Sequence, residues 1–168
     1  DWSLLLGVSF AIVPAFKMKF WNLGGNGQIL VGCLACFACM FYGQKYAMPK
    51  QTINILMVIS SITAGVVWAV IPAIFKAFFK TNESLFTLMM NYVAINLVAY
   101  YLLKWTPSGS STLGMLDEGH LPKLMDNEYL LLIIVVAILT VAMYIYLKYS
   151  KHGYEIAVVG ESENTAKY

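Results

Sequence analysis

Arginine is absent from this chain, and charge of either sign is scarce. All eleven basic residues are lysine; charged residues make up 12% of the sequence and hydrophobic residues 60%. A soluble domain carries about 25% charged residues, so the composition indicates an integral membrane protein. The lack of guanidinium groups argues against a nucleic-acid partner, because bidentate contacts to phosphates and bases depend on them. The net charge of +2 indicates nothing more about partners.

Residues that bind metals or carry out catalysis are equally few. Cys33, Cys36 and Cys39 have the spacing C-x2-C-x2-C, but the fourth cysteine and the proline of an iron–sulfur run are missing. We interpret them as small packing residues of a membrane helix. His120 has no second histidine or cysteine near enough for a metal site. The chain also lacks a G-x-x-x-x-G-K-[ST] phosphate loop and any plausible catalytic set, so we expect no enzyme, no metal and no cofactor.

Long apolar runs are present instead, and about 20 apolar residues suffice for a helix to cross a bilayer. They predict an all-α polytopic membrane protein with about five transmembrane helices. The expected helices are 2–16 (the tail of a span), 28–42, 52–75, 83–103 and 129–147. Small residues such as Ser61 and Gly65, four apart on one face, favour close helix packing. The polar, acidic stretch 104–128 is expected to be an extracytoplasmic loop.

The distribution of lysine predicts the orientation of the spans. If residues 150–168 are cytoplasmic, alternation places seven lysines inside and four outside, which agrees with the positive-inside rule. The inner lysines are Lys17, Lys19, Lys76, Lys80, Lys148, Lys151 and Lys167, and the outer ones are Lys45, Lys50, Lys104 and Lys123.

Two polar features interrupt the apolar runs. Residues 20–28, F-W-N-L-G-G-N-G-Q, hold three glycines and the amides of Asn22, Asn26 and Gln28, and Asn22 or Asn26 could cap the helix that begins near Gln28. This segment is either a turn at the membrane surface or non-helical backbone beside a cavity, where such backbone is tolerated. Thr87 and Asn91 share one face of helix 83–103, either for interhelical hydrogen bonds or for solute.

The C-terminal stretch G-Y-E-I-A-V-V-G-E-S-E-N-T-A-K-Y, residues 153–168, resembles the coupling-loop motif of ABC-importer permeases. The resemblance is to the branched-chain-type branch that serves sugars, nucleosides and riboflavin. Three more stretches are similar to that branch and come in its order: F-W-N-L-G-G-N-G-Q at 20–28, V-V-W-A-V-I-P-A-I-F-K-A at 66–77 and T-N-E-S-L-F-T-L-M-M-N-Y-V-A at 81–94. The nucleoside-type permeases are the most similar. Asn26 stands where the branch usually has glutamate. The motif's closing Gly-Ile is missing, so we expect a single permease domain, 1–168, truncated at both ends.

The resemblance implies a multi-pass subunit of the bacterial plasma membrane that moves a nucleoside, simple sugar or riboflavin-like solute inward by alternating access. It implies four kinds of partner: separate cytoplasmic ATPase subunits that hydrolyse ATP, a second permease subunit (identical or homologous), an extracytoplasmic solute-binding protein or lipoprotein, and membrane lipid. In this interpretation residues 150–168 are the cytoplasmic coupling segment.

The same resemblance suggests the site residues. Ile156, Ala157 and Val158 would give apolar contact to the ATPase, Gly160 would let the chain turn, and 161–167 would form a short helix. The coupling residues are therefore Ile156, Ala157, Val158, Gly160, Glu161, Asn164 and Ala166, and the solute-pathway residues are Asn22, Asn26, Gln28, Thr87 and Asn91.

Two alternatives stay open. An ion-coupled secondary transporter would use residues 20–28 as a broken helix, but it needs a carboxylate within a span, and only Glu83 lies even at a helix end. A non-transporting membrane scaffold would use the glycine-rich segment and the C-terminal segment only as connectors.

Overall fold

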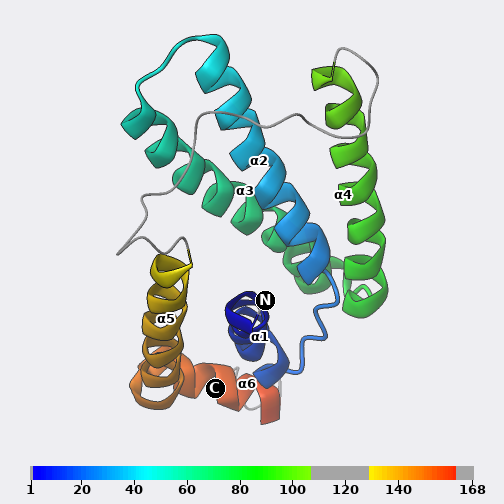
Figure 1. Ribbon diagram of the computed structural model, residues 1–168. Helices are drawn as coiled ribbons and strands as arrows, with labels where there is room; N and C mark the ends of the chain where they lie inside the picture. The colour runs from blue at the N-terminus through cyan, green and yellow to red at the C-terminus, as the bar shows by residue number, and fades with distance from the viewer. Residues whose placement is uncertain (1, 107–128, 162–168) are drawn as a thin grey trace. The chain divides into compact units, whose positions relative to one another are not determined.

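The computed structural model describes residues 2–106 and 129–161 of the chain. Within these residues the secondary structure is entirely helical. The helices are α1 (Trp2–Lys17), α2 (Gly25–Lys45), α3 (Lys50–Phe79), α4 (Glu83–Trp105), α5 (Leu130–Tyr149) and α6 (Lys151–Glu161) (Figure 1). The all-α class expected from the sequence is confirmed.

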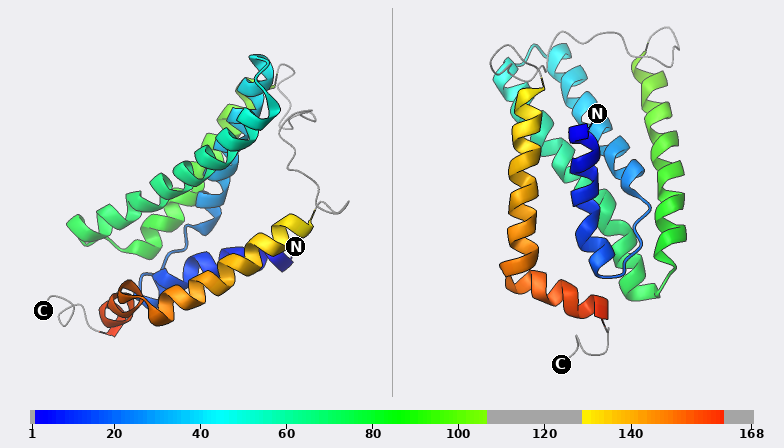
Figure 2. Two further views of the ribbon diagram at one scale, coloured as in Figure 1. Left: turned by 90° about the vertical axis from the view of Figure 1, so that its left-hand side faces the viewer. Right: turned by 60° about the horizontal axis from the view of Figure 1, so that its bottom comes forward.

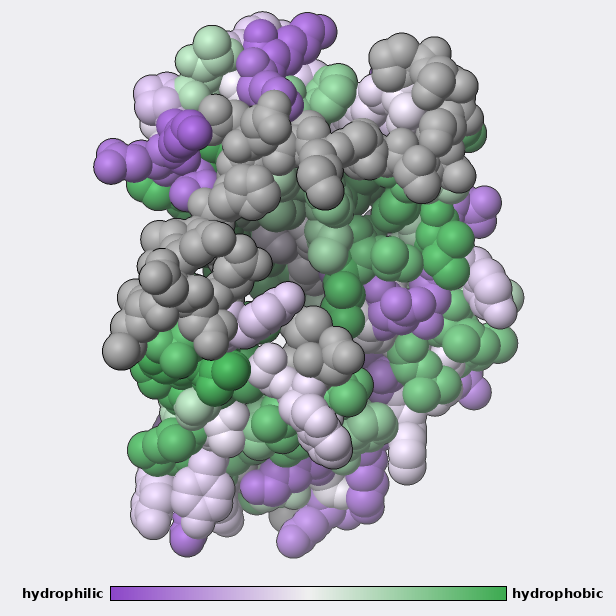
Figure 3. Space-filling model, in the orientation of Figure 1, coloured by the Kyte–Doolittle hydropathy of each residue, from purple (hydrophilic) through white to green (hydrophobic). Residues whose placement is uncertain are grey.

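Four of the described helices, α2, α3, α4 and α5, are long and apolar enough to cross a membrane, and α1 is a shorter apolar helix. None of the side chains of α5 is buried within the chain, although the helix is almost wholly apolar. Figure 3 shows hydrophobic atoms over α5 and hydrophilic atoms at the turn between α2 and α3. Apolar surface of this extent is unfavourable in water, so lipid or protein must cover it, and the polytopic membrane class is confirmed.

The helix ends differ from the expected ends by a few residues. α2 begins at Gly25 rather than near Gln28. α3 continues to Phe79, so the connector that the expected helices leave at 76–82 shrinks to 80–82. Lys80 ends α3 in the left-handed conformation, with a φ of 52°. Asn82 then caps α4, because its Oδ1 accepts a 3.2 Å hydrogen bond from the backbone N–H of Leu85.

The chain divides into two compact units. One contains residues 1–22 and 122–168, and its described helices are α1, α5 and α6. The other contains residues 23–121, and its described helices are α2, α3 and α4.

Small residues allow α2 to pack closely on α3 in the second unit. A Cβ added to Gly32 would lie 3.3 Å from Ser61 Oγ, and one added to Gly43 would lie 2.7 Å from the side chain of Ile53. The Cys39 thiol donates a 3.1 Å hydrogen bond to Ser60 Oγ across the same interface. The expectation of close packing through small residues is confirmed for this helix pair, because a side chain at either glycine would push the helices apart.

A corner between α5 and α6 shapes the first unit. Ser150 leaves the helical conformation at the end of α5, and its Oγ accepts a 3.0 Å hydrogen bond from the backbone N–H of Gly153 in the first turn of α6. Gly153 is buried against the last carbonyls of α5, which a side chain there would strike. Figure 2 shows the resulting sharp turn from α5 into α6. α1 packs along α5 and also contacts α6.

Candidate functional site

The start of α2 is bonded to α4 by four residues that we call the α2 anchor: Leu23, Gly27, Thr87 and Asn91. The backbone N–H of Leu23 donates to Thr87 Oγ1 at 3.1 Å, and the backbone N–H of Gly27 donates to Asn91 Oδ1 at 2.8 Å. Asn91 Nδ2 donates in return to the carbonyl of Leu23 at 2.9 Å. Two side chains of α4 therefore satisfy the polar backbone groups where α2 begins, as non-helical backbone near a membrane requires.

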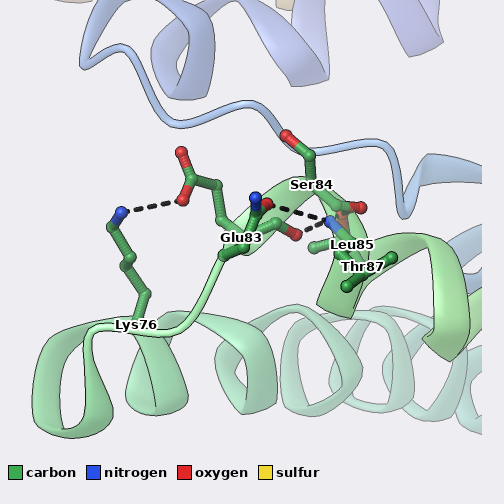
Figure 4. Close-up of polar contacts among 6 residues, drawn as sticks. Lys76, Glu83, Ser84, Leu85 and Thr87 are labelled. Atoms are coloured by element: carbon green, nitrogen blue, oxygen red, sulfur yellow. Dashed lines mark hydrogen bonds and ion pairs between the residues drawn. The ribbon is translucent and has the colours of Figure 1, made fainter.

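The anchor occupies the polar groups of both α4 side chains. Thr87 is fully buried, and its hydroxyl donates to the Glu83 carbonyl at 2.7 Å (Figure 4). The same hydroxyl oxygen accepts from the backbone N–H of Leu23. The carboxamide of Asn91 uses its oxygen for Gly27 and its nitrogen for Leu23. Of the two roles left open for Thr87 and Asn91, the geometry favours hydrogen bonding within the protein.

The side chain that caps the start of α2 comes from α4 and not from the segment 20–28. Gly24 is the N-cap residue of α2 and makes no side-chain cap hydrogen bond, so neither Asn22 nor Asn26 occupies the N-cap position that was expected for one of them. Asn91 supplies the missing acceptor to the third residue of α2, Gly27. The physical reason is proximity: with no side chain at Gly27, the carboxamide of Asn91 can approach the backbone of α2.

Gly27 is also the point at which three helices converge. A Cβ placed there would lie 2.9 Å from Asn91 Oδ1 and 3.2 Å both from Asn91 Cα and from Trp68 Nε1 on α3. The indole nitrogen of Trp68 is buried and has no hydrogen-bond partner among the described residues. Trp68 lies in the stretch 66–77, which resembles the same permease branch.

An ion pair joins the end of α3 to the start of α4. Lys76 Nζ lies 2.7 Å from Glu83 Oε2, and the Glu83 side chain is only 14% exposed against 38% for Lys76 (Figure 4). Sequence reasoning placed Lys76 in a connector and Glu83 in a first helical turn and missed the pair. The sequence feature that could have indicated the pair is its position: Lys76 and Glu83 lie in two stretches that resemble the permease branch, 66–77 and 81–94, on either side of a short connector.

The residues expected along the solute pathway are found in three settings. Thr87 and Asn91 are in the anchor, where their polar groups bond the protein. Asn26 is exposed and Gln28 is partly exposed in the first turn of α2, beside the anchor. Asn22 belongs to the first unit, where its backbone N–H donates to the Phe20 carbonyl at 2.9 Å, so the structure does not group it with the other four.

Five of the seven expected coupling residues lie on α6, Gly160 among them. Ile156, Ala157 and Val158 are partly buried in this helix, and Glu161 is its exposed last residue. Asn164 and Ala166 lie outside the described residues, as does most of the expected loop 104–128.

Gly160 does not turn the chain, which corrects the expectation from the sequence. α6 continues through it, and the residue is buried against the end of α1, where an added Cβ would overlap the Lys17 carbonyl oxygen. The structure describes a helix at Lys151–Glu161, and of the short helix expected at 161–167 only Glu161 lies within the described residues. The physical role of Gly160 is close approach between two helices.

The described residues contain no group of three histidine, cysteine, aspartate or glutamate side chains placed to hold a metal ion. The fold and the anchor together define a polytopic helical membrane protein in which a glycine-rich segment at the start of one helix is fastened to a neighbouring helix.

The chain belongs to the family described as the permease component of the branched-chain amino acid transport system, which matches residues 3–168. The family resemblance stated from the sequence motifs is confirmed, and the chain is a multi-pass membrane protein of this family.

Similar proteins include three named transport permeases. The guanosine ABC transporter permease protein NupP of Bacillus subtilis is 30% identical over 165 residues, which cover 94% of this chain and 47% of that protein. The glucose permease protein TsgB13 of Haloferax volcanii is 26% identical over 97% of this chain and 46% of its own length. The nucleoside permease protein NupB of Lactococcus lactis is 25% identical over 98% of this chain and 48% of its own length. The chain thus spans a little under half the length of these relatives, and no solved structure matches it.

Proposed function

We propose that this chain forms part of the permease subunit of an ATP-driven importer, and that its solute is a nucleoside. Family membership supports the permease role, and the names of two relatives, a guanosine and a nucleoside permease, support the solute class. ATP is hydrolysed by separate cytoplasmic subunits, a second permease subunit completes the pathway, and an extracytoplasmic solute-binding protein delivers the solute. The subunit itself catalyses no reaction.

The single observation that carries the proposal is the α2 anchor. It fixes non-helical backbone at the start of an apolar helix, and such backbone persists in a membrane beside protein or a water-filled cavity. Asn26 and Gln28 extend from the first turn of α2 next to this fixed point. Their amides can donate to and accept from the polar edge of a nucleobase or the hydroxyls of a ribose.

The site residues therefore have two different roles, solute contact and positioning of the segment that makes this contact. Asn26 and Gln28 contact the solute, whereas Thr87 and Asn91 hold the segment that presents them. Asn22, in the chain that leads into this segment, is retained as a further pathway residue. Asn26 stands where the resembling branch has glutamate, so this chain offers the solute a neutral amide in place of a carboxylate, which suits a solute without a positive charge.

For coupling, α6 is the surface on which an ATPase subunit docks. Gly160 places α6 against the carbonyl end of α1, so a displacement of α6 acts directly on α1. Ile156, Ala157, Val158 and Glu161 lie on this helix, and Asn164 and Ala166 follow it in the sequence.

The test is uptake of labelled guanosine by cells that express the full-length permease with its partner subunits. We expect Asn26→Ala and Gln28→Ala each to reduce uptake by roughly fivefold, the loss of about one hydrogen bond, at unchanged expression. Asn96→Ala is the matched control, because the exposed amide of Asn96 bonds only the Tyr92 carbonyl of its own helix. Excess adenosine should compete with guanosine, whereas glucose and riboflavin should not.

Three results would overturn the proposal. Unchanged uptake in both pathway variants would show that Asn26 and Gln28 do not contact the solute. Competition by glucose alone would show that the solute is not a nucleoside. Uptake that continues when the ATP-binding lysine of the partner ATPase is replaced would favour an ion-coupled transporter.

A further inference from the structure

An apolar groove between α1 and α5 in the first unit ends in two lysines. The groove has a volume of about 400 Å³, with apolar walls from Phe10, Val13, Met143 and Leu147 and with Lys17 and Lys148 also lining it. A second apolar groove of about 450 Å³ shares Phe10 and Met143 with the first and continues along the same two helices to Gly7. We call the two together the α1–α5 groove.

The length of the α1–α5 groove matches one leaflet of a membrane. Between Gly7 and Lys17 the helix rises about 15 Å, at 1.5 Å per residue. Half of the hydrocarbon core of a bilayer is also about 15 Å thick. A single acyl chain that enters at the lysine end would therefore stay in the groove to the middle of the membrane.

The lysine end of the groove carries positive charge that the described residues do not neutralise. Lys17 lies in the last turn of α1 and Lys148 in the last turn of α5. Lys148 Nζ donates a 2.9 Å hydrogen bond to the Tyr144 hydroxyl and lies 5.3 Å from the centre of the Tyr144 ring. No described carboxylate forms an ion pair with either lysine. Glu155, on α6, instead pairs with Lys151 at 3.9 Å, and its Oε2 lies 3.1 Å from His152 Nδ1.

We propose that the α1–α5 groove binds an anionic glycerophospholipid. One acyl chain lies between the two helices, and the phosphate is held by the ammonium groups of Lys17 and Lys148. Basic pockets between transmembrane helices on the cytoplasmic side are suited to such headgroups, and the cytoplasmic leaflet is the one rich in anionic lipid. Tyr144 lies at the level of the lysines, where an amphipathic ring is favourable at a membrane surface. The proposal is independent of the solute and of the transport mechanism.

The charge requirement is tested by native mass spectrometry of the full-length permease, purified in detergent and equilibrated with equal amounts of phosphatidylglycerol and phosphatidylethanolamine of the same acyl composition. The wild type should retain phosphatidylglycerol preferentially. Lys17→Gln with Lys148→Gln should weaken this binding by roughly 25-fold, about fivefold for each lysine near the surface. The control is Lys19→Gln with Lys151→Gln, which removes the same charge outside the groove and should leave the preference intact.

The acyl requirement is tested by filling the groove while keeping its charge. Val13→Trp should expel the lipid, whereas Ile134→Trp on α5, at a site outside the groove with similar exposure (43% against 38% for Val13), should not. Thermal unfolding and size-exclusion profiles establish that each variant is folded.

Three outcomes would contradict the proposal. An undiminished preference in the Lys17/Lys148 variant means that the lysines hold no headgroup. Equal loss in the Lys19/Lys151 control means general electrostatic attraction, and full retention in Val13→Trp means that no acyl chain occupies the groove. If Val13→Trp does not fold, Leu147→Trp from the opposite wall carries the same test.

Discussion

Asn91 on α4 caps the first turn of α2 by accepting a 2.8 Å hydrogen bond from the backbone N–H of Gly27. The same side chain donates to the carbonyl of Leu23, so one amide bonds the backbone at both ends of the segment 23–27. The position of this segment therefore depends on an amide from another helix.

Asn91→Ala should destabilise the protein, because it leaves the Gly27 N–H and the Leu23 carbonyl without their partner. We expect the free energy of unfolding to fall by about 2 kcal/mol, in the range for part-buried polar groups left unsatisfied. Reversible unfolding in mixed micelles measures the change. Asn96→Ala is the control, since its amide bonds a carbonyl of the same helix at an exposed position. Equal stability of the two variants would show that the interhelical cap contributes nothing.

Gly27→Ala should also be destabilising, and for a steric reason. Its Cβ would lie 2.9 Å from Asn91 Oδ1 and 3.2 Å from Asn91 Cα, so α2 and α4 would have to separate. Overpacking of this kind costs about 1–3 kcal/mol. Gly65→Ala on α3 is the matched control, because its nearest neighbour would be the Gln28 carbonyl at 4.0 Å. Alanine is the better helix former by up to about 1 kcal/mol, so the control should be neutral or stabilising. A Gly27→Ala protein as stable as the control would contradict the close approach of α2 and α4.

Gly160→Ala should uncouple the importer. A Cβ at this position would overlap the Lys17 carbonyl, so α6 would be pushed away from the end of α1. ATP-driven guanosine uptake should fall more than tenfold, while co-purification measures whether the ATPase is still bound. Gly7→Ala is the control in the same unit, since its Cβ would make an ordinary 3.8 Å contact with Val136. Normal uptake in Gly160→Ala would mean that the contact between α6 and α1 plays no part in coupling.

The Lys76–Glu83 ion pair should show a measurable interaction energy. In a double-mutant cycle with Lys76→Gln and Glu83→Gln, we expect a coupling of about 1 kcal/mol, at the upper end for exposed pairs because the glutamate is mostly buried while the lysine is partly solvated. Raising the salt concentration should lower the coupling. A coupling within experimental error of zero would show that the short connector alone sets the approach of α3 to α4.

Much of the fold could be predicted from the local physical chemistry of the sequence. Runs of apolar residues predicted α1 to α5 to within a few residues at most ends, whereas α6 was not predicted. Close packing of α2 on α3 followed from small residues on helical faces. The ordered motifs gave the family, which the match over residues 3–168 confirmed.

The candidate site was less accessible to sequence reasoning, because its contacts join residues far apart in the chain. The face shared by Thr87 and Asn91 follows from helical periodicity, but periodicity does not say which backbone that face meets. Gly160 shows the same limit: glycine suits both a turn and a close helix contact, and the partner, the Lys17 carbonyl, comes from the opposite end of the sequence.

By itself, the sequence of this protein determined the five apolar helices, their membrane character and the family, since these depend on composition, periodicity and motif order along the chain. Only the tertiary structure decided that the cap of α2 comes from Asn91, that Lys76 pairs with Glu83, and that Gly160 packs rather than turns. The physical reason is that hydrogen bonds, ion pairs and van der Waals contacts act over a few ångströms, so their partners are set only when the helices are packed together.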